Sequence, residues 1–156
     1  LFGWDSDYKV NPPLRTRADV AALIAGIQDG TIDCLSTDHA PHTPADKANG
    51  MAGISNIEHA FQICLKVFQE SGIPLTRLSE MLSLNPAKRL GLKAGLFLPG
   101  YAASVTALSV EEESEIDAMS MISRSHNTPF HGRKVMGRVL STIIDGEIKY
   151  EYSAAI

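Results

Sequence analysis

The stretch Thr31-Ile32-Asp33-Cys34-Leu35-Ser36-Thr37-Asp38-His39-Ala40-Pro41-His42 decides the fold class of this chain. Its first seven residues have the length and β-branched content of a buried strand, which we expect to end at Asp38. In parallel α/β folds the active site lies at the carboxyl ends of the strands. The carboxylate of Asp38, with two imidazoles just after it, is therefore predicted to point into a pocket.

The residue types in this loop suit two kinds of ligand. A carboxylate is a hard oxygen ligand for a divalent metal, and a neutral imidazole can bind the same ion or donate to a bound anion. An aspartate after a strand also commonly caps a turn or the next helix. Taken alone, residues 37–42 suggest a site without naming its chemistry.

The pattern before this strand indicates one repeat of a barrel. Apolar residues recur at helical spacing between Thr16 and Asp29, and Gly30 is a natural end for that helix. A helix that feeds a strand is one unit of a (β/α) barrel, and an earlier barrel strand is predicted around residues 7–10.

The pattern after the strand predicts a long functional loop and then more helices. The loop spans residues 39–53, which is longer than most barrel connections. A helix should begin at Ser55 with Glu58 completing a capping box, and end near Gly72. The apolar face of this helix comprises Ala60, Phe61, Cys64, Leu65 and Phe68.

Two shorter helices are expected next, followed by strands. The helices fit residues 76–83 and 86–90, the second with Asn85 as N-cap, Pro86 in its first turn and Gly91 as its end. Residues 104–108 alternate as a strand does, and residues 135–144 and 147–152 form a hairpin through Asp145-Gly146. This second half is predicted to be a small β-domain, with a boundary near residue 93.

Composition excludes several classes of function. The chain has 156 residues, 44% of them hydrophobic and 21% charged, with a formal net charge of -4. We find no basic tract for nucleic acid, no apolar segment long enough to cross a membrane, and no secretory signal. Cys34 and Cys64 are interpreted as buried thiols of a reducing compartment, so a cytoplasmic protein is expected.

The segment Lys9-Val10-Asn11-Pro12-Pro13-Leu14-Arg15, taken together with Asp38-His39-Ala40-Pro41-His42, resembles the dihydroorotases of the amidohydrolase superfamily. The two prolines should hold Asn11 in a rigid turn. The resemblance continues in order along nearly the whole chain, through Gly53-Ile54, Glu58, Ala60-Phe61, Asn85-Pro86-Ala87-Lys88, Asn127-Thr128-Pro129-Phe130 and Thr142-Ile143-Ile144-Asp145-Gly146.

This resemblance implies a fold: residues 1–93 would be the last units of a (β/α)8 TIM-type barrel, and residues 94–156 part of a β-sandwich domain. It also implies roles for single residues. Asp38 would ligate one metal of a two-zinc centre and act as general base. His42 would contact the substrate carboxylate, Asn11 the pyrimidine ring, and the main chain at Ala52-Gly53 the substrate, where many relatives have Phe-Gly.

The dihydroorotases also have an amino-terminal His-x-His pair, a bridging metal ligand and two further metal-binding histidines, none with a recognisable counterpart here. We therefore expect the carboxy-terminal portion of a longer enzyme, inactive when isolated, with the remaining ligands outside this chain. The parent would interconvert dihydroorotate and N-carbamoyl-aspartate in pyrimidine biosynthesis. Expected partners are the missing portion, a second copy in a homo-oligomer, and a carbamoyltransferase.

Two other functions stay open at this point. One is an allantoinase or hydantoinase, whose barrels end in similar loops; the other is a non-catalytic, dihydroorotase-like scaffold subunit. Among the remaining polar residues, His39 is interpreted as orienting the turn or as bonding a residue behind the site, and His59 as a partly exposed helical histidine. His126 and His131 are interpreted as surface or packing residues. The acidic run at residues 111–113 is interpreted as a solvated face or a helix start.

Overall fold

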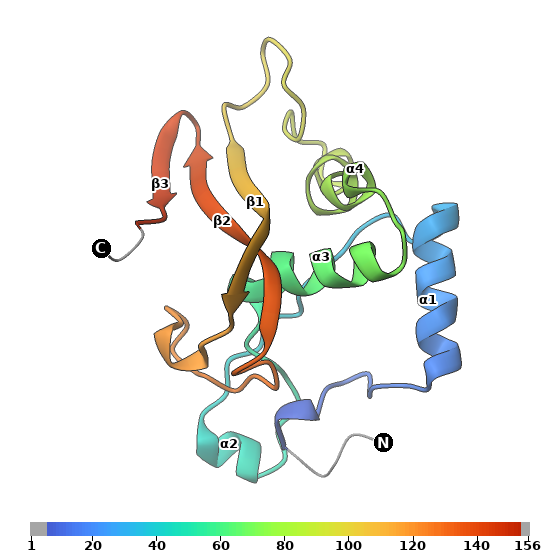
Figure 1. Cartoon of the computed structure of the whole chain (residues 1–156), viewed down its shortest axis with the longest axis vertical. Helices are drawn as coiled ribbons and strands as arrows, with labels where there is room; N and C mark the ends of the chain where they lie inside the picture. The colour runs from blue at the N-terminus through green and yellow to red at the C-terminus, as the bar shows by residue number, and fades with distance from the viewer. Residues whose placement is uncertain (1–5, 154–156) are drawn as a thin grey trace.

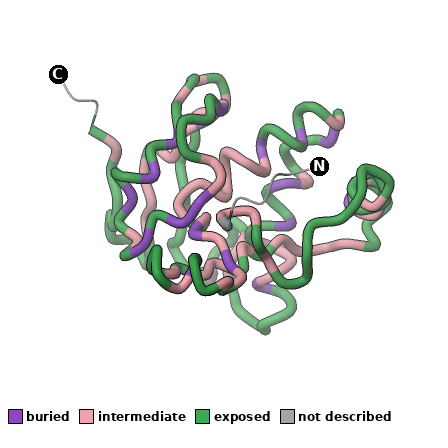
Figure 2. The backbone as a smooth tube through the Cα atoms, turned by 90° about the horizontal axis from the view of Figure 1, so that it is seen from below, coloured by how far each residue is buried: buried purple, intermediate pink, exposed green. Residues whose placement is uncertain are grey.

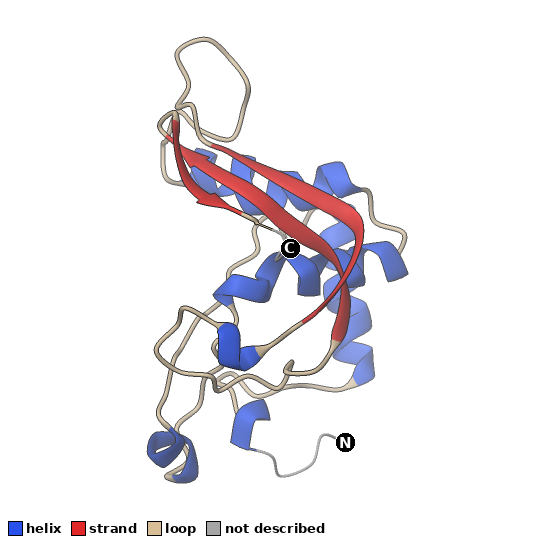
Figure 3. Ribbon diagram, turned by 60° about the vertical axis from the view of Figure 1, so that its left-hand side comes forward, coloured by secondary structure: helices blue, strands red, loops and turns tan. Residues whose placement is uncertain are grey.

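The computed structural model describes residues 6–153, in which the α-helices come before the strands along the chain (Figure 1). The strands form one antiparallel sheet in the order β1-β2-β3, which is twisted (Figure 3). The helical elements are η1 (Ser6–Tyr8), α1 (Arg17–Asp29), α2 (Pro44–Ala48), η2 (Ile57–His59), α3 (Ala60–Glu70), α4 (Leu75–Ser79), the π-helical η3 (Glu80–Leu84), α5 (Asn85–Arg89) and η4 (Ala118–Ser120). The strands are β1 (Val105–Glu115), β2 (Lys134–Ile144) and β3 (Glu147–Glu151).

Helix α1 confirms the prediction for residues 16–29. Thr16 and Asp19 form a capping box at its start, and Gly30 ends it in the left-handed conformation with φ 89°. Only Ile27 is buried on this helix, whereas Val20 and Leu23 are 50% and 56% exposed. The apolar face of α1 is therefore largely open to solvent, as is much of the chain (green in Figure 2).

The hydrophobic core lies between α3, the α4–α5 segment and the sheet. Leu65 and Phe68 of α3 are 0% and 1% exposed, which confirms the predicted buried face of this helix. Strand β2 approaches α3 closely at Gly137, where a β-carbon would lie 2.6 Å from Leu65 Cδ2 and 2.9 Å from Phe61 Cε1. The buried core residues are Ile27, Leu65, Phe68, Ile73, Leu78 and Met81, with Phe61, Cys64, Val110 and Met136 packed against them.

The strands predicted at residues 7–10 and 31–37 are not found as hydrogen-bonded strands. Residues 7–8 belong to η1, and residues 31–37 have no ladder partner among residues 6–153. A strand exists only by pairing with a neighbour. The polar groups of this segment bind instead to the α4–α5 segment: Leu35 N donates to Met81 O, Arg77 Nη2 to Ile32 O, and Asn85 Nδ2 to Asp33 O.

The two short helices predicted after residue 75 are one continuous helical segment. Helix α4 continues through the π-helical turn η3 into α5, so Asn85 has helical torsions and does not cap. Its side chain donates to Asp33 O at 2.8 Å, so tertiary contact outweighs its preference for an N-cap. Pro86 offers no N–H, and the wider turn before it lets the helix pass this residue. Gly91, with φ 68°, follows the end of α5 as predicted.

The hairpin prediction is confirmed in the second half of the chain. Strands β2 and β3 pair through Asp145 and Gly146, which have φ 51° and 84° as a tight primed turn requires. The acidic run at residues 111–113 is not a helix start, because it lies inside β1. Its side chains pair across the sheet, Glu112 with Arg138 and Glu113 with Lys134. None of the described helices is long and apolar enough to span a membrane.

Candidate active site

Three segments that carry the predicted site residues are joined by hydrogen bonds. Gly53 N donates to Lys9 O at 2.9 Å, which ties the turn containing Asn11 to the end of the long loop. Ala40 N donates to Ile54 O at 3.0 Å, within a parallel bridge between His39 and Ile54. Residues 9–11, 38–42 and 52–54 therefore lie together, although they are distant in sequence.

Asp38 has an exposed carboxylate and an uncommon backbone. Its φ is 45°, in the left-handed region that aspartate adopts more readily than most residues. None of residues 6–153 donates a hydrogen bond to its side chain. Such a backbone persists only where the surroundings hold it, and here the His39–Ile54 bridge follows directly. Both carboxylate oxygens of Asp38 are left available to a ligand.

His42 is half-buried and held at three atoms. Its ring Nε2 lies 3.0 Å from Ala52 O, and because a carbonyl only accepts, Nε2 carries the proton and donates. Its main-chain N donates to Asn127 Oδ1 at 3.0 Å, and its carbonyl accepts from Ser125 Oγ. The Nδ1 atom remains as the ring's other polar atom, an acceptor in the neutral form and a donor in the protonated form.

The turn at residues 52–53 uses most of its main-chain groups internally. Gly53 is buried with φ 147°, and its carbonyl accepts from Lys47 Nζ at 2.9 Å and from Asn127 Nδ2 at 3.1 Å. Ala52 O accepts from His42. The Ala52 N–H has no protein partner within the described residues, so it is the main-chain donor that this turn offers to a ligand. Asn11 is exposed, and no described residue hydrogen-bonds its side-chain amide.

The capping box predicted for Ser55 and Glu58 is wrong. Ser55 Oγ donates to Asn127 Oδ1 at 2.8 Å, and the Glu58 carboxylate accepts from the main-chain N–H groups of Ile122 and Ser123, each at 2.9 Å. His39 serves the helix start instead, because its Nδ1 accepts from Asn56 N and Ile57 N at 3.1 and 3.3 Å. His39 thus orients the turn, as the sequence interpretation expected.

The loop predicted over residues 39–53 contains the short helix α2. Thr43 caps α2 and forms a capping box with Asp46, a signal present in the sequence Thr-Pro-Ala-Asp that sequence reasoning missed. The hydrogen bonds from Thr43 to the Asp46 carboxylate lower the pKa of Asp46. Helix α2 also carries Lys47, which is only 4% exposed and whose ammonium group reaches the Gly53 carbonyl.

The loop at residues 121–128 is the main part of the site that sequence reasoning did not identify. It lies between η4 and β2, yet Ser125 and Asn127 bind the main chain around His42 and Gly53. In the sequence, Asn127 was noted only within the segment Asn127-Thr128-Pro129-Phe130 that resembles the dihydroorotases, and it was given no role. Nothing in the local pattern separates a buried, fully bonded asparagine from an exposed loop asparagine.

His59 is the histidine near this site whose pKa is shifted. Burial lowers the pKa of His59 from its ordinary value of 6.5, while the neighbouring Glu58 carboxylate acts in the opposite direction. Its Nε2 is buried without a hydrogen-bond partner among the described residues. His59 is thus a partly exposed side chain at the start of the helix, as expected, and its burial favours the neutral form, whereas His126 and His131 are exposed.

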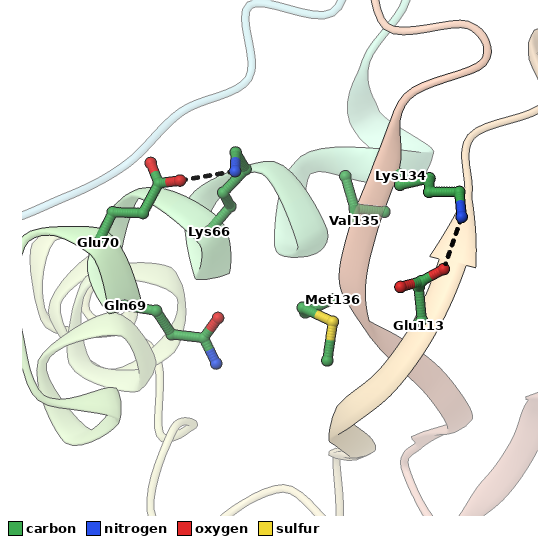
Figure 4. Close-up of a pocket in the computed structure, with 7 residues that line it drawn as sticks. All are labelled: Lys66, Gln69, Glu70, Glu113, Lys134, Val135 and Met136. Carbon is green, nitrogen blue, oxygen red and sulfur yellow. Dashed lines mark hydrogen bonds and ion pairs between the residues drawn. The ribbon is translucent and has the colours of Figure 1, made fainter.

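One hollow of the described surface has none of these residues in its lining, which comprises Lys66, Gln69, Glu70, Glu113, Lys134, Val135 and Met136 (Figure 4). It has a volume of about 250 Å³, and its charged side chains are paired, Lys66 with Glu70 and Lys134 with Glu113. A second hollow of about 130 Å³ is lined by Leu35, Ser36, Thr37, Asn56, Ala60, Ile63, Cys64, Leu82 and Phe130. Neither of these two hollows is lined by Asp38 or His42.

A metal ion requires several donor side chains held close together. Asp38 offers one unpaired carboxylate of the right chemistry, but residues 6–153 contain no group of three or more His, Cys, Asp or Glu side chains placed to hold an ion. A catalytic zinc commonly has three protein ligands. The described residues thus fit the role of one ligand, not of a whole site.

Comparison with known proteins gives consistent matches. Residues 10–149 match the family described as Amidohydrolase family. The chain is 41% identical to a dihydroorotase of Clostridium botulinum over 147 residues, covering 94% of this chain and 37% of that protein. It is 43% identical to a dihydroorotase of Desulforapulum autotrophicum over 152 residues, covering 95% of this chain and 35% of that protein. The chain therefore spans little more than a third of these curated relatives.

Solved structures give the same picture of the fold. An L-hydantoinase (dihydropyrimidinase) from Arthrobacter aurescens superposes with a TM-score of 0.88 at 27% identity, covering 96% of this chain and 36% of that one. A D-hydantoinase (dihydropyrimidinase) from Thermus sp. has a TM-score of 0.86 at 21% identity, covering 94% and 34%. These likenesses support the predicted TIM-barrel class, of which the described helices and loops form part.

Proposed function

Because this chain belongs to the amidohydrolase family, we propose that it supplies one side of the active site of a dihydroorotase, which interconverts dihydroorotate and N-carbamoyl-aspartate in pyrimidine biosynthesis. The observation that carries this proposal is the joining of the loops of Asp38, His42 and Ala52-Gly53. Identities of 41–43% to dihydroorotases across nearly the whole chain support the choice of reaction.

The free polar groups of the site suit the two ends of this substrate. Dihydroorotate has a carboxylate and a ring with amide N–H and C=O groups. The Ala52 N–H is a donor suited to the carboxylate, and the His42 ring lies beside it, bonded to Ala52 O. The Asn11 amide, which can donate and accept together, is suited to the ring. Asp38, with both oxygens unpaired, is the residue assigned to metal binding and to proton transfer at the reacting nitrogen.

We further propose a zinc centre of two ions, with Asp38 as one ligand and the other ligands outside residues 6–153. The unpaired carboxylate of Asp38 fits this role. A metal in such enzymes makes water nucleophilic near neutral pH. Within this chain, Asp38 binds the ion, while His42, Asn11 and the Ala52 N–H hold the substrate.

The finer division of the fold is also a proposal. Residues 1–93 would complete a (β/α)8 barrel, and residues 94–156 would form part of a β-sandwich. Support comes from the two halves themselves: the described helices α1–α5 precede residue 93, and all three strands follow it. The extended but unpaired segment 31–37 is where a barrel strand would find its neighbours.

Exposed apolar side chains support a partner for this chain. Val20, Leu23 and Phe97 are 50%, 56% and 86% exposed, and Leu90, Leu92 and Leu98 are each more than half exposed. We propose that the rest of the same enzyme covers these surfaces, and that the enzyme is a homo-oligomer in the cytoplasm, where Cys34 and Cys64 stay reduced. A carbamoyltransferase is a further candidate partner.

The hydantoinase-type alternative has its own support in the TM-score of 0.88 to the L-hydantoinase. The test is an assay of the full-length protein with dihydroorotate, allantoin and a hydantoin, with an Asp38→Asn variant as control. We expect turnover of dihydroorotate in preference to the other two, and its loss in the variant. Preference for allantoin or a hydantoin would replace the proposal, and no turnover by a folded, metal-loaded protein would favour the scaffold.

A further inference from the structure

Asn127 has the most fully bonded side chain near the candidate site. It is 7% exposed, and its Nδ2 donates to Ala40 O and to Gly53 O, both at 3.1 Å. Its Oδ1 accepts from His42 N at 3.0 Å and from Ser55 Oγ at 2.8 Å. An amide side chain has two donor hydrogens and two acceptor lone pairs, and all four are used here.

These four bonds fix the orientation of the amide. Two partners are carbonyl oxygens, which only accept, while His42 N only donates. Exchanging the Oδ1 and Nδ2 positions would therefore place an oxygen against two carbonyls and an NH2 group against the His42 N–H. An aspartate of the same shape would place an oxygen against the carbonyls of Ala40 and Gly53. No other residue type of this size satisfies the same four partners.

Two of the four partners of Asn127, His42 and Gly53, belong to the residues assigned to substrate, and none is Asp38, the residue assigned to metal. The bonds hold the main chain at His42 and at Gly53, next to the free Ala52 N–H. Asn127 does bond the carbonyl of Ala40, two residues after Asp38, but no described residue hydrogen-bonds the Asp38 carboxylate, and His39 pairs with Ile54 and accepts from Asn56 N. Asn127 is thus placed to set the distance between the two substrate-facing groups without contacting the Asp38 carboxylate.

The loop that carries Asn127 is itself anchored at two further points. The Glu58 carboxylate binds the N–H groups of Ile122 and Ser123, and Ser125 Oγ donates to the His42 carbonyl. A loop held from η2 at one end and from His42 at the other presents Asn127 as a rigid spacer.

We infer that Asn127 is a positioning residue for substrate binding, which sets the His42 ring and the Ala52 N–H at the separation that the substrate carboxylate requires. This inference rests on the proposed function. A misplacement of about 1 Å in such groups can lower activity by about 100-fold. Because Asn127 does not contact the Asp38 carboxylate, the loss should fall mainly on KM.

The test compares Asn127→Asp with Asn85→Asp in the full-length enzyme. Asn85 is a matched control, since its Nδ2 also donates to a main-chain carbonyl, Asp33 O at 2.8 Å, away from the site. For Asn127→Asp we expect KM for dihydroorotate to rise about 10-fold or more, with kcat changed less than about threefold and bound metal unchanged. Asn85→Asp should lower Tm and leave KM within about twofold.

Two results would overturn the inference: an unchanged KM in Asn127→Asp, or an equal rise of KM in Asn85→Asp. If Asn127→Asp does not fold, Ser125→Ala decides, since it removes the bond to the His42 carbonyl; a raised KM supports the inference and an unchanged KM contradicts it. Absence of dihydroorotate turnover in the wild-type enzyme would instead show that the proposed function is wrong, and the inference would fall with it.

Discussion

Gly53 and His42 lie so close that a β-carbon on Gly53 would be 2.9 Å from His42 Nε2. The same β-carbon would be 2.6 Å from Ala40 Cβ, and the φ of 147° at Gly53 disfavours any L side chain. The position therefore accepts only glycine if the His42 ring is to keep its bond to Ala52 O.

Gly53→Ala is expected to push the His42 ring away from Ala52 and to raise KM for the substrate. The strained backbone should also lower the free energy of unfolding by about 1–3 kcal/mol. Substrate kinetics and urea unfolding of the same variant measure the two effects. Gly50→Ala is a useful comparison, because its β-carbon would meet only the flexible end of Lys9; an equal rise of KM there would contradict the argument.

His39 should matter for the helix start rather than for metal binding. His39→Ala leaves the N–H groups of Asn56 and Ile57 without their acceptor, and we expect a loss of about 1–2 kcal/mol of stability. His39→Asn supplies a side-chain oxygen near the Nδ1 position and should recover part of the lost stability. Metal content measured on both variants should match the wild type; a loss of metal in the stable Asn variant would assign His39 as a ligand.

The free energy of unfolding should decrease as the pH falls below 6.5, because of His59. Burial lowers the pKa of this imidazole in the folded protein below its ordinary value of 6.5. The unfolded state therefore binds a proton first as pH falls, so the contribution of neutral His59 is full above pH 6.5 and declines below it. Urea midpoints measured at several pH values should show a smaller decline in His59→Gln than in the wild type, and an equal decline in the two would contradict this account.

The contact between β2 and α3 predicts a large penalty at Gly137. Gly137→Ala puts a β-carbon 2.6 Å from Leu65 Cδ2, and overpacking of this kind commonly destabilises by about 1–3 kcal/mol in addition to backbone strain. Gly146→Ala is the matched control, because it shares a positive φ of 84° but would meet nothing within 4 Å. Thermal unfolding should separate the two variants; equal losses would mean that backbone strain alone accounts for both.

The 156-residue chain alone is expected to show no turnover of dihydroorotate. Residues 6–153 contain Asp38, the ligand proposed above, but no group of three metal-binding side chains. The same chain mixed with the remaining part of the enzyme should gain both metal and activity. Metal analysis and an activity assay on one preparation decide the matter, and turnover by the chain alone would contradict the prediction.

Features encoded by neighbouring residues could be predicted from the sequence. Helix α1, the buried face of α3 and the hairpin at Asp145-Gly146 depend on local spacing and turn chemistry, so they were found. The strand at residues 31–37 was predicted from its composition, but pairing is a property of two segments, and no described segment pairs with it.

In the candidate site, too, contacts between residues far apart in the chain could not be predicted from the local sequence. The resemblance assigned roles in one site to Asp38, His42 and Gly53. The prediction that Ser55 and Glu58 form a capping box was wrong. The same side chains can instead bind residues 122–127, and only the fold decides between the two arrangements. Asn127 could not be identified for the same reason, since its partners lie 72 to 87 positions away.

The clamp of Glu58 on Ile122 and Ser123 has a consequence for motion. Ile122 is 88% exposed and lies in a loop, where rapid amide hydrogen exchange would be the ordinary expectation. Because its N–H is held by a carboxylate from η2, its exchange should require opening of the contact between this loop and the start of α3. The amides of residues 122 and 123 are therefore natural reporters of site opening, and a bound substrate that stiffens the His42 loop should slow their exchange through Ser125 and Asn127.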